Sequence, residues 1–178
     1  VSDLINHFPS RYLDYSKTTP IDSLEPNDDV CIKATVDSIT SVRLRSRKTV
    51  QKATISDSSD SIELTWFNQP YLKDTLKKGD TYFFTGRTTA YQNSVTLNSP
   101  DFEPVRDQQL HANRIIPTYP LTHGISHKWL RHKIHLVLSS LHLDEILPTQ
   151  IHQQTKTVSQ DQAYHHIHFP PSQHDLSE

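Results

Sequence analysis

The clearest pattern of hydrophobic and polar positions lies near the middle of the chain. Ile62, Leu64 and Trp66 alternate with Glu63, Thr65 and Phe67. A period of two predicts a strand with one buried face, formed here by the isoleucine, the leucine and the tryptophan. Phe67 therefore falls on the polar face of its own strand, where little is available for its ring to pack against. An aromatic ring in this position is a candidate binding residue.

A second aromatic residue follows where this strand ends. Pro70 ends the strand, and residues 71–72 lead into a short helix-like turn over residues 73–78 that Gly79 closes. Tyr71 precedes this turn, and three lysines follow this tyrosine closely, namely Lys73, Lys77 and Lys78. Aromatic rings with cations nearby form a stacking platform for unpaired nucleic-acid bases. The alternative is structural, in which Phe67 covers a neighbouring loop and Tyr71 closes the bottom of a barrel.

Four other segments are also predicted to be strands. They are separated by polar turns and span residues 30–44, 49–56, 81–87 and 94–97. The helix-like turn of residues 73–78 lies between the third and fourth of the five strands. Five strands with a helix at this point follow the order of an OB-fold, which is a five-stranded Greek-key barrel. The sequence therefore predicts a mainly β protein built on an OB-fold.

Helical and extended segments flank the predicted barrel. Residues 2–8 have the pattern of a short helix, and Ser126 is expected to cap an amphipathic helix with a regular apolar stripe. The exposed side of that helix is expected to carry Lys128, Arg131 and Lys133. These patterns divide the chain into an N-terminal helix and lead-in over residues 1–28, an OB-fold over 29–104, and a connector, helix and linker over 105–178.

Positive charge is concentrated in the barrel, although the whole chain has a net charge of -2. Residues 30–98 contain ten lysines and arginines against six acidic residues. The predicted turn between the first two strands is strongly basic, and such loops flank the ligand face of OB-folds. The alternative is a solvated hairpin tip. The candidate phosphate-binding residues are Arg43, Arg45, Arg47, Lys48, Lys73, Lys77, Lys78 and Arg87.

Several other kinds of site are not supported by the sequence. The single cysteine, Cys31, excludes a disulfide framework and a cysteine zinc site, and it indicates a reducing compartment such as the cytoplasm. No apolar run reaches the ~20 residues of a membrane span. The histidines match no zinc motif, so no metal ligand is assigned. No nucleophile–base pair stands out and no phosphate-cradling glycine loop is present, so we expect neither a catalytic residue nor ATP hydrolysis in this chain.

Four segments resemble parts of one known family, and they occur in the same order as in that family. They are Leu4-Ile5-Asn6-His7-Phe8-Pro9-Ser10-Arg11-Tyr12-Leu13-Asp14, Trp66-Phe67-Asn68-Gln69-Pro70-Tyr71-Leu72, Pro117-Thr118-Tyr119-Pro120-Leu121-Thr122-His123-Gly124-Ile125-Ser126 and Ile167-His168-Phe169-Pro170-Pro171-Ser172. Together they resemble the wedge domain of RecG, an ATP-dependent DNA helicase that remodels stalled replication forks. The resemblance covers nearly the whole chain. The turns at residues 57–60 and 91–93 depart from it, because they lack the glycines usual in the family.

The resemblance implies a function in DNA repair and recombination. The family's wedge binds branched DNA, such as stalled forks and Holliday junctions, and splits strands at the junction. Two aromatic residues of the family stack on bases there, and their positions fall on Phe67 and Tyr71, with Trp66 adjacent. The motor domains, with their ATP and Mg²⁺, would belong to a part of the protein that is missing here. The implied partners are branched DNA and those motor domains, and the implied state is a monomer.

Two alternatives from other classes remain open. An OB-fold can instead be a protein-interaction module, in which the aromatic face would hold a partner peptide. DNA binding should weaken steeply with salt, whereas an apolar peptide contact should not. The histidine-rich composition also suggests a metal-binding protein, which zinc or nickel would stabilise.

Overall fold

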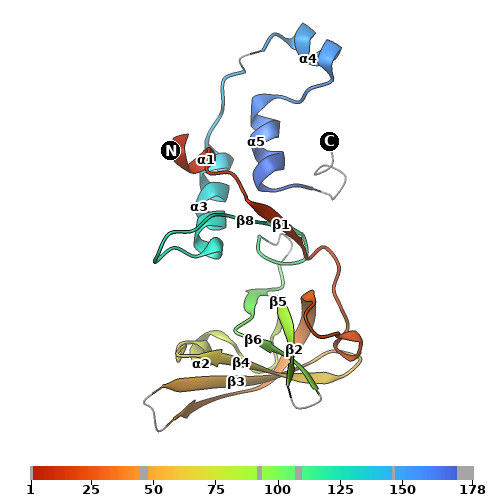
Figure 1. Ribbon diagram of the computed structural model, residues 1–178, viewed down its shortest axis with the longest axis vertical. Helices are drawn as coiled ribbons and strands as arrows, with labels where there is room; N and C mark the ends of the chain where they lie inside the picture. The colour runs from red at the N-terminus through yellow and green to blue at the C-terminus, as the bar shows by residue number, and fades with distance from the viewer. Residues whose placement is uncertain (1, 45–47, 92–93, 107–109, 146, 172–178) are drawn as a thin grey trace. The chain divides into compact units, whose positions relative to one another are not determined.

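The computed structural model describes residues 2–44, 48–91, 94–106, 110–145 and 147–171. The chain forms two compact units (Figure 1). One unit consists of residues 15–113. The other combines residues 1–14 with residues 114–178, so the two ends of the chain belong to the same unit. The hydrophobic pattern alone had placed these two ends in separate flanking segments.

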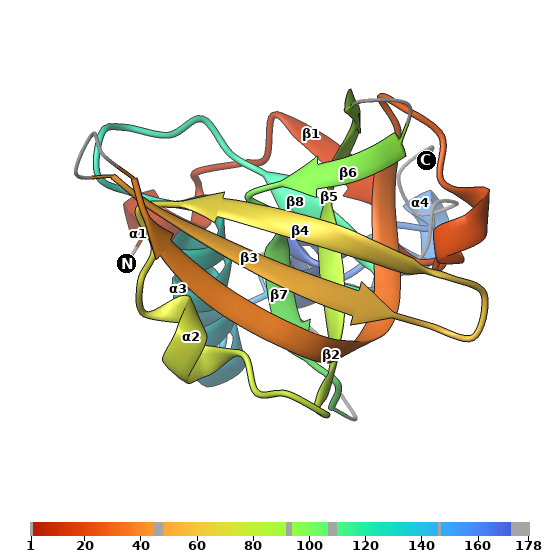
Figure 2. The ribbon, with the colours of Figure 1, turned by 90° about the horizontal axis from the view of Figure 1, so that it is seen from below.

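Residues 15–113 form a closed barrel of five strands. Its strands are β2 (Asp29–Arg43), β3 (Thr49–Ser56), β4 (Ser61–Phe67), β5 (Thr81–Tyr91) and β6 (Ser94–Asn98). They are ordered β2-β3-β4-β6-β5, and a pairing of β2 with β5 closes the barrel (Figure 2). The β4–β6 pair is parallel and the other pairs are antiparallel. With α2 (Leu72–Thr75) between β4 and β5, this is the order of an OB-fold, which confirms the predicted fold class.

Strand β2 is long enough to pair with two different strands of the barrel. Its first half, Asp29–Thr35, pairs with β5, and residues from Thr35 onward pair with β3. The register shifts between Val36 and Ser38, as at a β-bulge. A bulge bends a strand and increases its twist, so it allows β2 to turn from one partner to the other. The short strand β7 (Asp101–Pro104) pairs with β5, and the 3-10 helix η1 (Ile21–Ser23) precedes β2.

The barrel is filled by the inward-facing residues of its strands. The burial pattern of β4 alternates as predicted, with Ile62, Leu64 and Trp66 buried and Phe67 exposed. The same core contains Leu72 and Leu76, from α2 and the residue that follows it. The turn that carries Tyr71 is therefore attached to the core by two buried leucines.

The second unit is mostly helical and is built around a small two-stranded sheet. Strand β1 (Arg11–Asp14) pairs antiparallel with β8 (Ile115–Thr118). The helices are α1 (Ser2–Ile5), α3 (His127–Ser140), α4 (Thr149–Thr155) and α5 (Gln160–His168). Its buried apolar cluster consists of Ile5, Tyr119, Leu130, Ile134 and Leu138. None of the described helices is long and apolar enough to cross a membrane.

Helix α3 forms largely as its sequence predicts. The hydroxyl of Ser126 caps it by accepting a hydrogen bond from the backbone N–H of Trp129. The predicted apolar stripe faces the core, with Leu130, Ile134 and Leu138 buried and Val137 and Leu141 partly buried. The expectation that Arg131 lies on the exposed side is wrong. Arg131 is buried, and its Nη1 donates to the carbonyl oxygen of Pro117 at 3.2 Å. An arginine at a position that the helical pattern assigns to the polar face can thus be buried, where it donates a hydrogen bond to a buried carbonyl.

Candidate nucleic-acid interface

Phe67 and Tyr71 are the two exposed aromatic residues at the end of β4. Their exposed fractions are 53% and 57%, which confirms the predicted exposure. Phe67 is the last residue of β4, and Tyr71 immediately precedes α2. Each ring is thus attached to an element whose other residues, Trp66 and Leu72, are fixed in the barrel core. The chain presents two large apolar surfaces to solvent from a rigid base.

Trp66 does not belong to this surface. Its exposed fraction is 1%, and its Nε1–H donates to the carbonyl oxygen of Pro100 at 2.9 Å. An indole that fills the core and has its N–H paired has no free face for a base. The expectation that Trp66 stacks on DNA is therefore wrong. The strand alternation places Trp66 on the buried face, and the adjacent position in the family motif is not enough to assign it a role in binding.

The segment between the two rings is fixed by hydrogen bonds to β3. Asn68 has a φ of 56°, in the left-handed region that asparagine tolerates better than most residues. Its N–H donates to the carbonyl oxygen of Thr49 at 2.8 Å, and its Oδ1 accepts from the N–H of Thr49 at 3.2 Å. This reciprocal pair ends the β3–β4 ladder and turns the chain toward Tyr71.

Gln51 is a residue of the site that the sequence analysis missed. It is completely buried on β3, and its Oε1 accepts from the backbone N–H of Gln69 at 3.0 Å. The side chain of Gln69 in turn accepts a hydrogen bond from the hydroxyl of Tyr71 at 2.8 Å. A signal was present in the sequence, because Gln51 shares the inward face of its strand with Ala53 and Ile55.

A groove lies beside Phe67 on the outer face of the barrel. Its volume is about 330 Å³, and residues of β3, β4, β5 and β6 line it. The lining exposes more apolar than polar surface, and hydroxyl, amide and charged groups lie among the apolar atoms. Lys52 and Glu63 form an ion pair of 2.6 Å in this lining. The groove is formed by Val50, Lys52, Glu63, Thr65, Phe67, Thr89, Ala90, Thr96 and Asn98.

The candidate phosphate-binding residues fall into groups that the fold separates. Arg43 and Lys48 are exposed at the end of the β2–β3 hairpin, whereas Arg45 and Arg47 lie outside the described residues. Arg43 pairs in register with Thr49, which is also bonded to Asn68, so the hairpin and the Phe67 end of β4 lie at the same end of the barrel.

The other cations lie on two different parts of the barrel. Lys73, Lys77 and Lys78 are exposed in and just after α2, close in sequence to Tyr71. Arg87 is exposed on β5, where it pairs with Asp29 at the start of β2, and its Nε donates to the carbonyl oxygen of Asn27 at 3.1 Å. The structure thus does not bring Arg87 together with Arg43.

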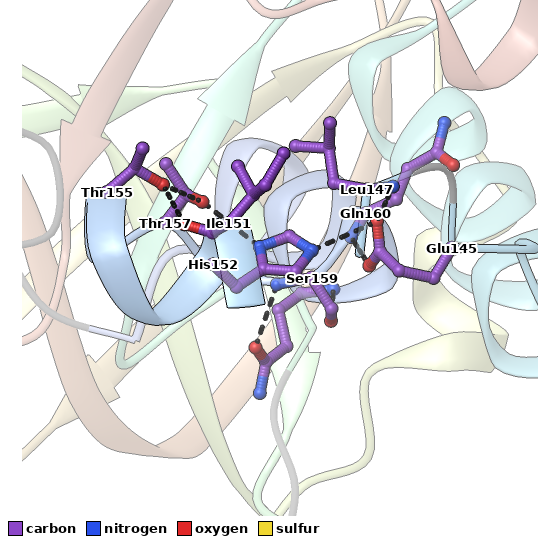
Figure 3. Close-up of polar contacts among 9 residues, drawn as sticks. Glu145, Leu147, Ile151, His152, Thr155, Thr157, Ser159 and Gln160 are labelled. Atoms are coloured by element: carbon purple, nitrogen blue, oxygen red, sulfur yellow. Dashed lines mark hydrogen bonds and ion pairs between the residues drawn. The ribbon is translucent and has the colours of Figure 1, made fainter. Parts of the chain in front are cut away.

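Another connected polar cluster in the described chain lies around α4 (Figure 3). Nδ1 of His152 lies 3.0 Å from the hydroxyl of Thr157, and Nε2 lies 3.2 Å from Glu145. The carboxylate of Glu145 also accepts from the N–H groups of Gln160 and Leu147, and these bonds lower its pKa. The contacts join the segment before α4 to the start of α5, so they hold these segments together.

Neither this cluster nor the rest of the described chain indicates a metal or redox centre. No group of three or more histidine, cysteine, aspartate or glutamate side chains is arranged to hold a metal ion in that part of the chain. Cys31 is buried in the barrel, and burial raises the pKa of its thiol. A buried thiol with a raised pKa is a poor nucleophile.

Known proteins similar to this chain point to one family. The model of the RecG wedge domain matches residues 1–141. The chain is 31% identical to the ATP-dependent DNA helicase RecG of Thermotoga maritima, an alignment that covers 98% of this chain and 23% of the relative. It is 25% identical to the RecG helicase of Staphylococcus aureus strain NCTC 8325, over 99% of this chain and 26% of the relative.

A solved structure leads to the same family. A structure of RecG bound to a three-way DNA junction superposes with a TM-score of 0.87 at 30% identity, covering 99% of this chain and 25% of that one. The chain spans about a quarter of the length of these relatives. From the family match and this similarity, we conclude that the chain belongs to the RecG wedge domain family.

Proposed function

We propose that this chain binds branched DNA and separates strands at the junction, as the wedge of a RecG-type ATP-dependent DNA helicase. The substrates would be stalled replication forks and Holliday junctions, in DNA repair and recombination. The proposal is supported by family membership and by the similar RecG structure, which is bound to a three-way DNA junction.

The observation that carries the proposal is the pair of exposed rings at the end of β4. Phe67 and Tyr71 are four residues apart, more than half exposed, and attached to the core through their neighbours. Bases at a branch point lose a stacking partner when the strands part, and an aromatic ring can replace it. Such contacts are worth roughly 1–3 kcal/mol per base and tolerate any sequence. Recognition would therefore depend on branch shape.

Cations around these rings would hold the DNA backbone. Arg43 and Lys48 lie on the hairpin side, and Lys73, Lys77 and Lys78 lie on the α2 side. Phosphate contacts position a protein on DNA without reading its sequence. Arg45 and Arg47 would extend the hairpin group, and Arg87 would touch phosphate only where a strand passes the start of β2. The groove beside Phe67 offers a path for one separated strand.

In the whole protein, motor domains would hydrolyse ATP with Mg²⁺ and draw DNA past this wedge. The chain described here would contribute binding and strand separation, and no catalytic residue. We further propose that the protein acts in the cytoplasm as a monomer, with branched DNA and its own motor domains as partners.

The test is binding of a fluorescently labelled three-way fork, measured by anisotropy, with duplex and single-stranded DNA as controls. The wild-type chain is expected to prefer the fork. The double variant Phe67→Ala, Tyr71→Ala should bind the fork at least about tenfold more weakly, given the size of stacking contacts. Trp129→Ala is a matched control, because Trp129 is a half-exposed aromatic residue of the other unit.

The proposal fails if the three DNAs bind equally and the double variant changes nothing. In that case only a generic basic surface would remain. Binding of a peptide that persists at high salt would favour the protein-interaction alternative, because apolar contacts are less sensitive to salt than phosphate contacts are.

A further inference from the structure

Gln51 is a polar side chain at a position of the barrel core where an apolar one would be expected. Its exposed fraction is 0%, and it points inward like Ala53 and Ile55 on the same strand. Burying an amide is costly unless its polar atoms find partners. Both ends of this amide are paired. Nε2 donates to the hydroxyl of Ser41 at 3.0 Å, and Oε1 accepts from the N–H of Gln69 at 3.0 Å.

These two bonds connect three parts of the barrel. Ser41 lies on β2, Gln51 on β3, and Gln69 in the loop that follows β4. The loop would otherwise be held on one side by Asn68, through its bonds to Thr49, and on the other by Leu72 in the core. The bond from Gln69 lies between these two attachments, next to Asn68. It fixes the residue that separates the two exposed rings.

The same loop residue also restrains the second ring. The hydroxyl of Tyr71 donates to Oε1 of Gln69 at 2.8 Å. A hydrogen bond at the hydroxyl favours one orientation of the tyrosine ring. Ordering it before binding lowers the entropy lost when a base stacks on it. A chain of contacts therefore runs from the core amide of Gln51 through Gln69 to the ring of Tyr71.

We propose that Gln51 is a positioning residue that, with Gln69, sets the separation and orientation of Phe67 and Tyr71 for a DNA branch point. This inference rests on the proposed function. Gln51 would not touch DNA itself. Its contribution would appear as preference for the fork over duplex, and not as general affinity, because the phosphate contacts do not depend on the two rings.

Two variants test the inference. Gln51→Leu keeps the volume of the side chain but leaves Gln69 N–H and Ser41 without their partner. Tyr71→Phe keeps the ring and removes only the hydroxyl that anchors it, at an exposed position where folding is not at risk. Ile55→Val is the control, because it trims the same inward face of β3 without touching the loop.

The measurement combines anisotropy with fluorescence of 2-aminopurine placed at the branch point of the fork. We expect Gln51→Leu to lower the fork-to-duplex affinity ratio about tenfold and Tyr71→Phe about threefold. Duplex binding should stay unchanged, and the 2-aminopurine signal of the bound fork should change in both. Ile55→Val should lower the unfolding midpoint and leave the ratio at its wild-type value.

Two results would overturn the inference. One is a wild-type ratio and an unchanged 2-aminopurine signal in the Tyr71→Phe variant. The other is a loss in Gln51→Leu that affects fork and duplex equally, because that pattern reports only a less stable barrel. Failure of the proposed function looks different: the wild-type chain would then show no fork preference for these variants to alter.

Discussion

The two units of this molecule are each stabilised internally by a different balance of interactions. Residues 15–113 are joined mainly by strand ladders that close around one apolar cluster. In the other unit, the ladder is confined to four paired residues on each of β1 and β8. Its helices pack on a small cluster, and the buried polar side chains of Thr118, Arg131 and His168 hydrogen-bond to backbone carbonyls.

This difference indicates how each unit should respond to change. A closed barrel fixes its backbone independently of most single side chains, so surface loops can carry binding residues on a rigid base. In the helical unit, the buried His168 makes stability sensitive to protonation. Each unit also contains one of the two tryptophans, Trp66 in the barrel and Trp129 in the helical unit, so the two can be followed separately.

The largest expected effect comes from breaking the barrel core. Leu64→Ala removes a completely buried side chain between β3 and β6. It should cost about 2–5 kcal/mol of stability, from reduced burial and the cavity left behind. The measurement is urea unfolding followed by fluorescence in a Trp129→Phe background, where Trp66 alone reports. Leu44→Ala, at an exposed position, should change stability by less than about 0.5 kcal/mol. Equal effects of the two variants would show that the barrel core is not organised as described.

The next effect should appear on acidification, in the helical unit. His168 is completely buried, and its Nε2 must donate to the carbonyl oxygen of Ile5 at 2.7 Å, because a carbonyl can only accept. Nδ1 is then left to accept from the hydroxyl of Tyr119 at 3.0 Å. Burial lowers the pKa of His168 below its usual 6.5, and the nearby His7 and His165 lower it further, although the bond to Ile5 acts in the opposite direction.

The sign of the pH effect follows from this lowered pKa. Below about pH 6.5 the unfolded chain takes up a proton that folded His168 resists. The stability contribution is therefore complete above that pH, and it is lost as the pH falls toward the lower pKa of the folded state. Urea unfolding at pH 7.5 and pH 5.5 in a Trp66→Phe background should show this loss through Trp129.

A histidine variant supplies the control for the pH experiment. His168→Gln can keep a donor for Ile5 but cannot titrate, so its stability should fall less between the two pH values. Part of the pH dependence should remain, because burial also lowers the pKa of His135. A wild-type unit that is equally stable at both pH values would contradict the prediction.

The smallest of the three effects is expected on the salt dependence of DNA affinity. It tests whether lysines of the barrel or lysines of the helical unit contact DNA. Replacing Lys73, Lys77 and Lys78 with glutamine should reduce the slope of log affinity against log salt by up to about 0.9 for each phosphate that the variant no longer neutralises. The matched control replaces three lysines of the helical unit, Lys128, Lys133 and Lys156. A control that lowers the slope as much as the barrel variant would mean that DNA binds to both units.

The sequence predicts the barrel well because strand alternation is a local signal. The periodicity around Leu64 separates Trp66 from Phe67 without any knowledge of the fold, and the five strands follow in the correct order. Alternation also places Gln51 on the inward face. What it cannot show is the partner of that amide, because Ser41 and Gln69 lie on other elements.

The helical unit is less predictable because its contacts are long-range. The pairing of β1 with β8 joins residues about a hundred positions apart, and neither short segment has a distinctive pattern of its own. Helix α5 was not expected, although Ser159 and Gln162 form a capping box at its start. Arg131 shows the same limit, since only the fold reveals that the carbonyl of Pro117 lies within its reach.

The pairing of β1 with β8 indicates where the barrel could be deleted or exchanged by protein engineering. Asp14 and Ile115 are register partners, so the chain leaves the helical unit and returns to it at neighbouring positions. The barrel is therefore an inserted domain, and its two ends join neighbouring positions of the helical unit, which acts as the host domain. A short reverse turn could replace residues 15–113 without stretching the host, and a different barrel could be grafted at the same junction. Exchange of whole barrels between related chains would require only this one junction.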